Sequence, residues 1–276
     1  MTICIHHNDL DGRCAAAIVQ KAITGPIAFH ETDYKDPAPA EENIRNMDVV
    51  IVDFSYKPEV MARIIALAKS VTWIDHHATA KDYPYQYLPG LRNFNEKEKS
   101  GCELAWDYYF SQKIPNISPM AVRLIGDYDK WALDLAPSCF QFYEGAKLIP
   151  TLNHPDSNKW QLLLDDFGWE SIVEDGKIAI QYRDNYCGNL CRSFGYETEI
   201  VGHKAYACNQ FMFGSGGFGE RFKQYPLCLA YIHDGSRFTV SLYSETVDVG
   251  QIAKAHGGGG HKGAAGFICE ALPFKK

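Results

Sequence analysis

Short apolar runs alternate with amphipathic segments over roughly the first 75 residues of the chain. Residues 2–5 and 71–75 have the pattern of short strands, and residues 48–53 form a β-branched run that can be buried on both faces of a parallel sheet. An alanine-rich helix is expected at residues 13–23, and Pro58 suits the first position of a second helix. This order of strands and helices predicts a doubly wound parallel sheet, and hence an α/β fold.

Helix signals also mark the middle of the chain. Ser100 with Glu103 has the spacing of a capping box, which predicts a helix through Tyr109. Ser118 and the proline after it begin another helix, which we expect to end near Gly126.

The last part of the chain has a different character. A long, polar helical pattern interrupted by Gly176 and Gly188 predicts a helix that connects two domains. Beyond it, two apolar runs flank Asp234-Gly235, which is a hairpin signal. We therefore expect a first domain at residues 1–168, a connecting helix at 169–195 and a smaller α/β domain with a mixed sheet at 196–276.

Composition is that of an ordinary globular protein, with 46% hydrophobic and 22% charged residues among 276. We expect no membrane span, because the sequence has no apolar stretch of about 18 residues. The N-terminus lacks the features of a secretion signal, and the nine scattered cysteines suit reduced thiols, so we expect a cytoplasmic protein.

The net charge of −7 argues against a protein that wraps long nucleic acid, because 34 acidic residues outnumber 27 basic ones. Clustered metal-binding aspartates would account for part of the acidic excess. The charge is compatible with a small or short anionic substrate held by metal ions.

Ligand-type side chains follow three of the expected strands. The segment HHNDLDG, residues 6–12, follows the first strand, Asp53 ends the second, and Asp75-His76-His77 ends the third. In open α/β sheets, ligands bind at the edge formed by the carboxyl ends of the strands. Carboxylates and imidazoles suit Mn²⁺ or another divalent first-row ion better than a thiolate-binding metal.

Each of these segments alone has a simpler interpretation. An Asp-X-Asp-Gly segment is usually a turn, a strand-terminal aspartate is usually a helix cap or a loop anchor, and a pair of histidines is usually a surface feature. All three together at strand ends favour a metal site. The segment Gly126-Asp127-Tyr128-Asp129 supplies further carboxylates, which a site with two metals needs.

The sequence resembles the DHH phosphoesterase superfamily, which includes RecJ-type exonucleases, nano-RNases, cyclic-dinucleotide phosphodiesterases and family II pyrophosphatases. Four segments look like its motifs I to IV: His7-Asn8-Asp9-Leu10-Asp11-Gly12, Val52-Asp53-Phe54-Ser55, Asp75-His76-His77 and Gly126-Asp127. Two more look like its associated C-terminal domain, DHHA1: Gly257-Gly258-Gly259-Gly260-His261 and Ala264-Ala265-Gly266-Phe267. The resemblance implies a catalytic, metal-binding DHH domain at residues 1–168 and a substrate-binding DHHA1 domain at 196–276.

The resemblance also implies a site for two metal ions, usually Mn²⁺, with Mg²⁺ or another divalent ion as the alternative. One ion would be held by His7, Asp9 and Asp53, and the other by Asp11, Asp53, His76 and Asp127. The resemblance gives His77 a contact with the substrate phosphate and a part in protonating or orienting the leaving group. Asp75 would fix a histidine tautomer beside them.

Two ligand positions leave alternatives. Many members of the superfamily have the metal-binding histidine four residues before the first aspartate, where this chain has Ile5. His7, two residues before it, matches a shorter form of the motif, and His6 is the alternative ligand. Asp129 is the alternative to Asp127.

The glycine run in the last domain predicts a loop that approaches a ligand closely. Gly257, Gly258, Gly259, Gly260 and His261 are the candidates for binding a phosphate or carboxylate, largely through backbone N–H groups. Many relatives carry an arginine in a strand before this run, whereas this chain has Tyr243. We expect Tyr243 to stack on a base or to donate one hydrogen bond in place of a bidentate phosphate contact.

These features predict a two-metal phosphoesterase acting on phosphodiester bonds of short oligonucleotides or small nucleotides. The alternatives are a phosphomonoesterase, pyrophosphatase or polyphosphatase of the same superfamily, or a catalytically silent nucleotide-binding relative. Aromatic residues near the motifs, Tyr34 among them, could stack on a base, although core packing is the better explanation for them. A homodimer is left open.

Overall fold

The computed structural model describes residues 1–95, 97–111, 118–211, 213–260 and 262–276. These residues form two compact units, 1–179 and 180–276. The division falls within α8 (Trp169–Phe194), the long helix expected from the sequence. The helix is continuous through Gly176 and Gly188, where the sequence predicted interruptions.

The first unit contains the predicted doubly wound parallel sheet. Its strands are β1 (Thr2–His7), β2 (Ile27–Thr32), β3 (Asp48–Val52) and β4 (Ser70–Ile74), all parallel and in the order β2-β1-β3-β4. Strand β2 was not predicted. It lies at the edge of the sheet and is mostly half-buried, so it lacks the continuous apolar run of the central strands.

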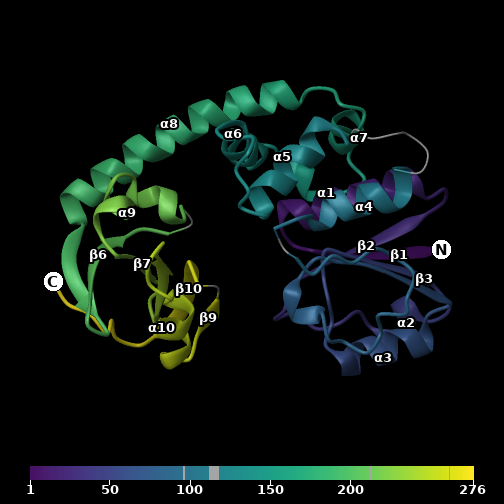
Figure 1. The fold of residues 1–276 in the computed structure, drawn as a ribbon, viewed down its shortest axis with the longest axis horizontal. Helices are drawn as coiled ribbons and strands as arrows, with labels where there is room; N and C mark the ends of the chain where they lie inside the picture. Colours follow the sequence, from purple (N-terminus) through teal and green to yellow (C-terminus); the bar gives the residue numbers. More distant parts are fainter. Residues whose placement is uncertain (96, 112–117, 212, 261) are drawn as a thin grey trace. The chain divides into compact units, whose positions relative to one another are not determined.

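Helices cover both faces of this sheet (Figure 1). One face carries α1 (Leu10–Ala22), α4 (Gly101–Phe110), α5 (Met120–Asp129), α6 (Ser138–Ala146) and α7 (Asn158–Leu164). The other face carries α2 (Glu41–Ile44) and α3 (Pro58–Leu67). Because strand side chains alternate between faces, Cys4 packs into the first core while Ile3 and Ile5 pack into the second. Short 3₁₀ turns lie at η1 (Ala78–Ala80) and η2 (Pro150–Asn153).

Local signals set several helix ends in this unit. Helix α3 begins at Pro58 as predicted, and Ser100 and Glu103 form the predicted capping box. Helix α1 begins at Leu10, three residues earlier than predicted, because the Asp9 side chain caps it by accepting a hydrogen bond from the Gly12 amide at 2.8 Å. Helix α5 also runs past the predicted end near Gly126, to Asp129.

The second unit contains the predicted mixed sheet, in the order β5-β6-β7-β8-β10-β9. Its strands are β5 (Tyr196–Ile200), β6 (His203–Asn209), β7 (Leu227–His233), β8 (Phe238–Tyr243), β9 (Gly259–Gly260) and β10 (Ala264–Cys269). Strands β6 and β7 are parallel and the other neighbours are antiparallel, including the predicted β7–β8 hairpin. The helical elements are η3 (Ser215–Phe218), α9 (Arg221–Gln224) and α10 (Val249–Ala255).

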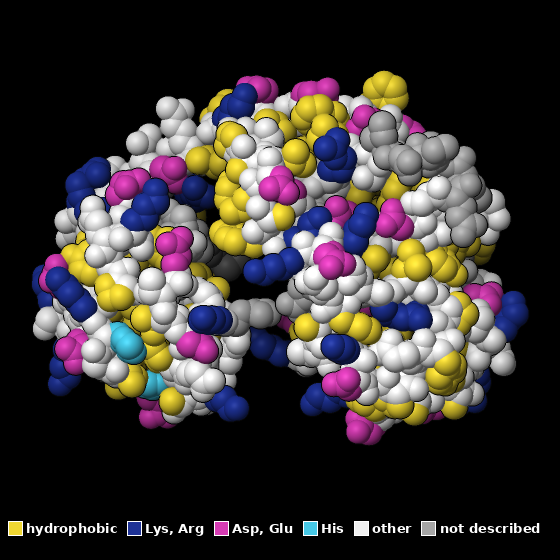
Figure 2. All heavy atoms as spheres, viewed as in Figure 1, with side chains coloured by type: hydrophobic (Ala, Val, Ile, Leu, Met, Phe, Trp, Pro, Cys, Tyr) yellow, Lys and Arg dark blue, Asp and Glu magenta, His cyan; other side chains and the backbone are white. Residues whose placement is uncertain are grey.

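Charge on the surface is mixed. Figure 2 shows acidic and basic side chains interspersed over the visible face instead of gathered into one basic band. Within the described residues, no helix combines the length and apolar character needed to cross a bilayer.

Candidate metal centre

The predicted ligand residues of the first unit lie at the point where the strand order reverses. The chain crosses to one side of β1 to form β2 and to the other side to form β3. In sheets of this topology, ligands bind beyond the carboxyl ends of the strands at that switch point. His7 ends β1, Asp53 follows β3 directly, and the Asp75-His76-His77 segment follows β4.

Asp53 is at the centre of this site. Its side chain is 1% exposed, and its backbone has a positive φ of 52°, which is unusual for a residue other than glycine. Neither carboxylate oxygen accepts a hydrogen bond from the described part of the chain, although His76 Nε2 lies 3.2 Å from Oδ1. An ionised carboxylate buried in this way needs a cation or a proton.

The electrostatics of Asp53 lead to the same conclusion. Burial raises the pKa of the Asp53 carboxyl well above its ordinary value. Repulsion from the carboxylates of Asp11, Asp9 and Asp129 raises this pKa further. A divalent cation among these four carboxylates would offset the repulsion and keep them ionised.

His7 and Asp9 form one side of the centre. His7 Nδ1 lies 2.7 Å from Asp9 Oδ2 and 3.8 Å from Asp53 Oδ2. Burial opposes ionisation of Asp9, but its contact with His7 outweighs burial and lowers the Asp9 pKa to about 2. His6 is 1% exposed and its Nδ1 lies 2.8 Å from the His7 carbonyl oxygen. Of the two histidines, only His7 is grouped with the aspartates, because neighbouring strand residues point to opposite faces.

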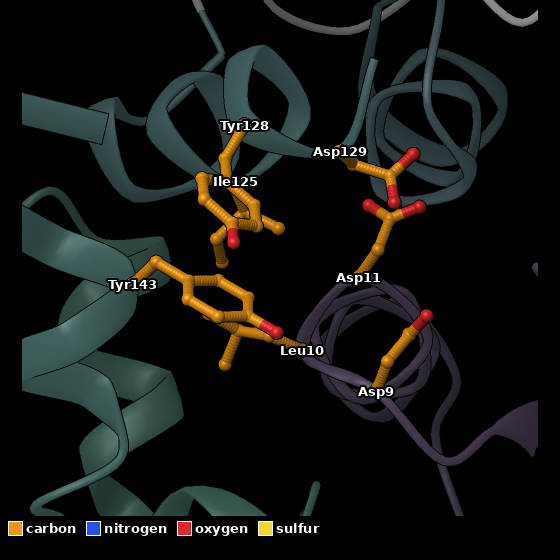
Figure 3. A pocket seen from close by; sticks show the side chains of 7 residues that line it. All are labelled: Asp9, Leu10, Asp11, Ile125, Tyr128, Asp129 and Tyr143. Atoms are coloured by element: carbon orange, nitrogen blue, oxygen red, sulfur yellow. The ribbon is translucent and has the colours of Figure 1, made fainter. Parts of the chain in front are cut away.

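Asp11, His76 and Asp129 form the other side. Asp129 Oδ2 lies 3.5 Å from His76 Nε2, and Figure 3 shows the carboxylates of Asp11 and Asp129 pointing toward one another. Burial raises the pKa of Asp129 well above its ordinary value, and the nearby charges of Asp11 and Asp9 add to this effect. The two carboxylates therefore repel each other across a space that a cation would fill.

Asp11 is fixed in place by the start of α4. Its carboxylate accepts hydrogen bonds from Ser100 Oγ at 2.9 Å, from the Gly101 amide at 2.7 Å and from the Cys102 amide at 3.1 Å. The amides at a helix N-terminus favour a negative charge, so the start of α4 is a suitable anchor for this carboxylate.

The structure favours Asp129, the alternative ligand, over Asp127. The two oxygens of Asp127 accept hydrogen bonds from the backbone amides of Asp134 and Leu135, at 2.9 and 3.0 Å. Asp127 therefore holds the segment after α5 and is in none of the ligand groups. Residues two apart on a helix point to nearly opposite sides, so only one of these two aspartates can face the centre.

His77 lies beside the ligands and is oriented by Asp75. His77 Nδ1 is 2.7 Å from Asp75 Oδ1, and the other Asp75 oxygen accepts a hydrogen bond from Ser55 Oγ. Burial lowers the pKa of His77, but the hydrogen bond to Asp75 outweighs it and raises the pKa to about 9. This pairing fixes the ring and leaves Nε2 as the nitrogen that can meet a substrate.

Three overlapping groups of side chains have the spacing of metal ligands. They are His7, Asp9 and Asp53; Asp53, His76 and His77; and Asp11, His76 and Asp129. Asp53 and His76 each belong to two groups, as expected where neighbouring cations share ligands. The oxygen and imidazole donors fit a hard or borderline divalent cation such as Mn²⁺ or Mg²⁺.

The role of Gly101 was not predicted from the sequence. A Cβ on Gly101 would lie 2.4 Å from the Asp53 Cβ and 2.5 Å from its Oδ1. Position 12 also has no room for a side chain, because a Cβ on Gly12 would lie 2.5 Å from the His7 carbonyl oxygen. The only signal for Gly101 was its place directly after the capping residue Ser100, and this does not reveal a contact with Asp53.

Apart from His77, the predicted substrate-binding residues lie in the second unit. Tyr243 ends β8 and its half-buried ring packs 6.3 Å from that of Phe218. The amides of Gly257 and Gly258 donate hydrogen bonds to carbonyl oxygens of α10, at 3.1 and 2.8 Å. These two amides therefore cap the helix and are not free to bind a phosphate.

The rest of the glycine run is more open. Gly259 and Gly260 form the edge strand β9 and are exposed. His261, the last predicted member of the set, lies outside the described residues. A phosphate-binding role for Gly259, Gly260, His261 and Tyr243 stays a prediction.

Comparison with known proteins agrees with this description. Residues 1–125 match the DHH family, N-terminal domain. An uncharacterized protein of Acanthamoeba polyphaga mimivirus is 26% identical over 252 residues, which cover 85% of this chain and 57% of that relative. The chain thus spans little more than half the length of that relative.

Two solved structures share the fold. The pGpG-specific phosphodiesterase PggH from Vibrio cholerae aligns with a TM-score of 0.57 and 15% identity, over 98% of this chain and 94% of that one. The exonuclease RecJ bound to manganese aligns with a TM-score of 0.52 and 13% identity, over 97% of this chain and 85% of that one.

Fold and site together define an α/β protein with clustered carboxylates and imidazoles at the switch point of a parallel sheet. Residues 1–125 match the N-terminal domain of the DHH family, as the ordered motifs in this part of the chain predicted, and the fold is shared with the two solved structures.

Proposed function

We propose that this protein is a metal-dependent phosphohydrolase that cleaves phosphodiester bonds in short oligonucleotides or small nucleotides. The observation that carries the proposal is the buried Asp53 carboxylate, which accepts no hydrogen bond from the described residues and lies among histidines and other carboxylates. Such a donor set suits a pair of divalent cations, for which we propose Mn²⁺, with Mg²⁺ as the alternative.

All the grouped side chains except His77 act as metal ligands in this proposal. His7, Asp9 and Asp53 would hold one cation, and the second would be held by Asp53 together with three further side chains, Asp11, His76 and Asp129. When bound, the cations lower the pKa of a water molecule and stabilise the charge that develops on the phosphate oxygens.

His77 and Asp75 have a separate task. In hydrolysis, water attacks phosphorus, the bond from phosphorus to the leaving oxygen breaks, and that oxygen gains a proton. We assign the delivery of this proton, or a hydrogen bond to the phosphate, to the imidazolium of His77. The hydrogen bond with Asp75 keeps the ring protonated and correctly turned.

The preference for nucleotide substrates has two supports. Two proteins that share the fold are described as a pGpG-specific phosphodiesterase and an exonuclease, the latter bound to manganese. In addition, Tyr34 is 55% exposed although its ring lies 6.0 Å from that of His77, so a base next to the scissile phosphate has an aromatic ring on which to stack.

A release assay in Mn²⁺ tests the proposal. The substrates are a dinucleotide, a five-mer, a cyclic dinucleotide, a nucleoside 3′,5′-bisphosphate and pyrophosphate, each with the wild type and with Asp53→Ala. We expect mononucleotides from the dinucleotide or five-mer with the wild type only. Phosphate released from pyrophosphate or the bisphosphate alone would overturn the diesterase assignment, and equal activity of Asp53→Ala would overturn the metal centre.

A further inference from the structure

A pocket lined mainly by residues outside the ligand groups adjoins the candidate metal centre within the first unit. A small hollow of about 50 Å³ lies directly on Asp9, Asp11 and Asp129 (Figure 3). A larger pocket of about 300 Å³ lies next to it, and Asp9, Leu10 and Tyr143 line both. A volume of this size is at the lower end of the range for small-molecule sites.

The larger pocket differs chemically from the metal centre. Its polar lining comes from two amides, Asn8 and Asn153, and two cations, Arg13 and Lys147. Asp9 is the single carboxylate among its lining residues, and it faces the metal centre as well. Amides can form hydrogen bonds with the polar edge of a nucleotide, and cations can bind its phosphate. A cluster of carboxylates would repel that phosphate.

Arg13 is held in place but keeps donors available. Its Nε and Nη2 donate to the two oxygens of Glu31, at 2.7 and 3.1 Å. This contact uses two of the five guanidinium N–H groups and fixes the orientation of the others. Glu31 does not line the pocket, so of these two residues only the cationic Arg13 faces it.

Lys147 is also held by neighbouring side chains. Its Nζ lies 4.6 Å from the centroid of the Tyr143 ring and 3.0 Å from Glu144 Oε1. Glu144 does not line the pocket. The lysine side chain is 49% exposed, so its ammonium group can turn toward a bound anion at little cost.

The walls between these polar groups are apolar. Tyr143 stacks on Tyr128, with ring centroids 3.9 Å apart and planes 16° apart, and this pairing keeps the Tyr143 ring as a rigid wall. Leu10, Ala146 and Leu152 complete the apolar surface. An apolar slot with polar groups at its margins fits a sugar and base, whose faces are apolar and whose edges form hydrogen bonds.

We propose that this pocket binds the nucleoside next to the scissile phosphate together with a second phosphate. The inference rests on the proposed function and names the substrate class more narrowly, as a nucleotide with a second phosphate one nucleoside away from the cleaved one. Asn8 and Asn153 would contact the base or sugar, and Lys147 and Arg13 the second phosphate. Pyrophosphate would leave the pocket empty.

Steady-state kinetics with Lys147→Ala test the inference. The substrates are ApA without a terminal phosphate, ApA with a 5′-phosphate and ApA with a 3′-phosphate. The control is Lys177→Ala, because Lys177 forms an equivalent exposed pair with Glu174, three residues before it on α8. We expect Lys147→Ala to raise KM about 10-fold or more for one of the phosphorylated dinucleotides, because a charge-assisted contact is lost. The KM for ApA itself, and all values for Lys177→Ala, should match the wild type.

The phosphorylated dinucleotide that responds also shows which end of the substrate occupies the pocket. An equal effect of Lys147→Ala on all three dinucleotides, or no effect on any of them, would overturn the inference.

Equilibrium binding separates this inference from the proposed function. The same three dinucleotides, labelled with a fluorophore, are titrated into Asp53→Ala protein with and without Lys147→Ala, so that no hydrolysis is required. Lys147-dependent binding without hydrolysis by the wild type would overturn the proposed function and support the pocket. Hydrolysis by the wild type with binding that is independent of Lys147 would overturn the pocket alone.

Discussion

Gly101 lies against Asp53 so closely that a single methyl group would not fit, because a Cβ at position 101 would lie 2.4 Å from the Asp53 Cβ. The two residues are 48 positions apart in the sequence, one directly after β3 and the other at the start of α4. The same turn of α4 donates hydrogen bonds to Asp11. The start of α4 thus positions two carboxylates of the candidate metal centre.

Gly101→Ala should therefore damage the centre more than the fold. Overpacking of this kind costs about 1–3 kcal/mol of the free energy of unfolding. We expect weaker Mn²⁺ binding, measured by calorimetric titration, together with a loss of phosphohydrolase activity. The control is Gly188→Ala in α8, where a Cβ would meet only Arg192 Nη1 at 3.4 Å and should stabilise the helix by about 0.5–1 kcal/mol. Unchanged metal affinity in Gly101→Ala would contradict the positioning role.

Asp129→Ala should mainly weaken metal binding, whereas Asp127→Ala should mainly lower the stability of the fold. Asp129 faces His76 and is a proposed ligand. Loss of a group that only orients a ligand lowers metal affinity by up to roughly 100-fold, so loss of Asp129 should lower it by more than that. Loss of Asp127 leaves two backbone amides without their acceptor, which should cost about 1–3 kcal/mol of stability. Metal titration and chemical denaturation of both variants give the comparison. Stronger loss of metal affinity in Asp127→Ala would restore the assignment that the sequence favoured.

Asp53 should make the stability of the metal-free protein depend on pH. Its pKa is raised in the folded state, so the folded protein binds more protons than the unfolded chain, and this group's contribution to stability falls as pH rises through that range. In chelator, Asp53→Asn should be more stable than the wild type at about pH 8, and the difference should shrink at about pH 5.5. Urea denaturation of both proteins at the two pH values measures it. A difference independent of pH would show that Asp53 is not under this electrostatic strain.

Mn²⁺ should reverse the order of these two proteins. A ligand that binds only the folded state, at about 100 times its Kd, stabilises a protein by about 2.7 kcal/mol. The wild type should gain this stability in Mn²⁺ and lose it in chelator, whereas Asp53→Asn should gain little. Thermal unfolding with and without Mn²⁺ records both effects. Equal gains for the two proteins would place the bound ion away from Asp53.

Asp75→Asn should change His77 without removing a proposed ligand. The hydrogen bond from His77 to Asp75 raises the pKa of His77 to about 9, so the substitution should lower that pKa toward its ordinary value. We expect a fall in kcat of about 10–100-fold. Ser55→Ala, which removes only the hydroxyl that donates to Asp75, is the milder control. Histidine NMR titration of the metal-free proteins supplies the pKa, and an unchanged His77 pKa in Asp75→Asn would contradict the pairing.

Much of this architecture could be predicted from local sequence patterns. Continuous apolar runs identify buried strands, and residues directly after such strands must lie at one edge of a parallel sheet. For this reason the pattern of strands alone is enough to place His7, Asp53 and His76 together. The capping box at Ser100 and the start of α3 at Pro58 were equally local, because each depends on neighbours within one helical turn.

Other features were decided by contacts between distant residues. The choice between Asp127 and Asp129 depends on which side of α5 faces the sheet edge, and the Gly126-Asp127 motif, which favoured Asp127, does not reveal this. The amides of Gly257 and Gly258 cap α10, so a glycine run that resembles a phosphate loop is partly accounted for by helix termination. The edge strand β2 has no continuous apolar run, because its side chains are mostly half-buried at the edge of the sheet.

The sequence by itself determined most of the side chains that this protein brings to its candidate metal centre, because alternation and strand length place them through short-range geometry alone. Only the tertiary structure decided how closely those side chains approach one another, and that Gly101 must lack a side chain for them to do so. Such contacts join residues far apart in the chain and depend on the packing of complete elements, about which a local pattern carries no information.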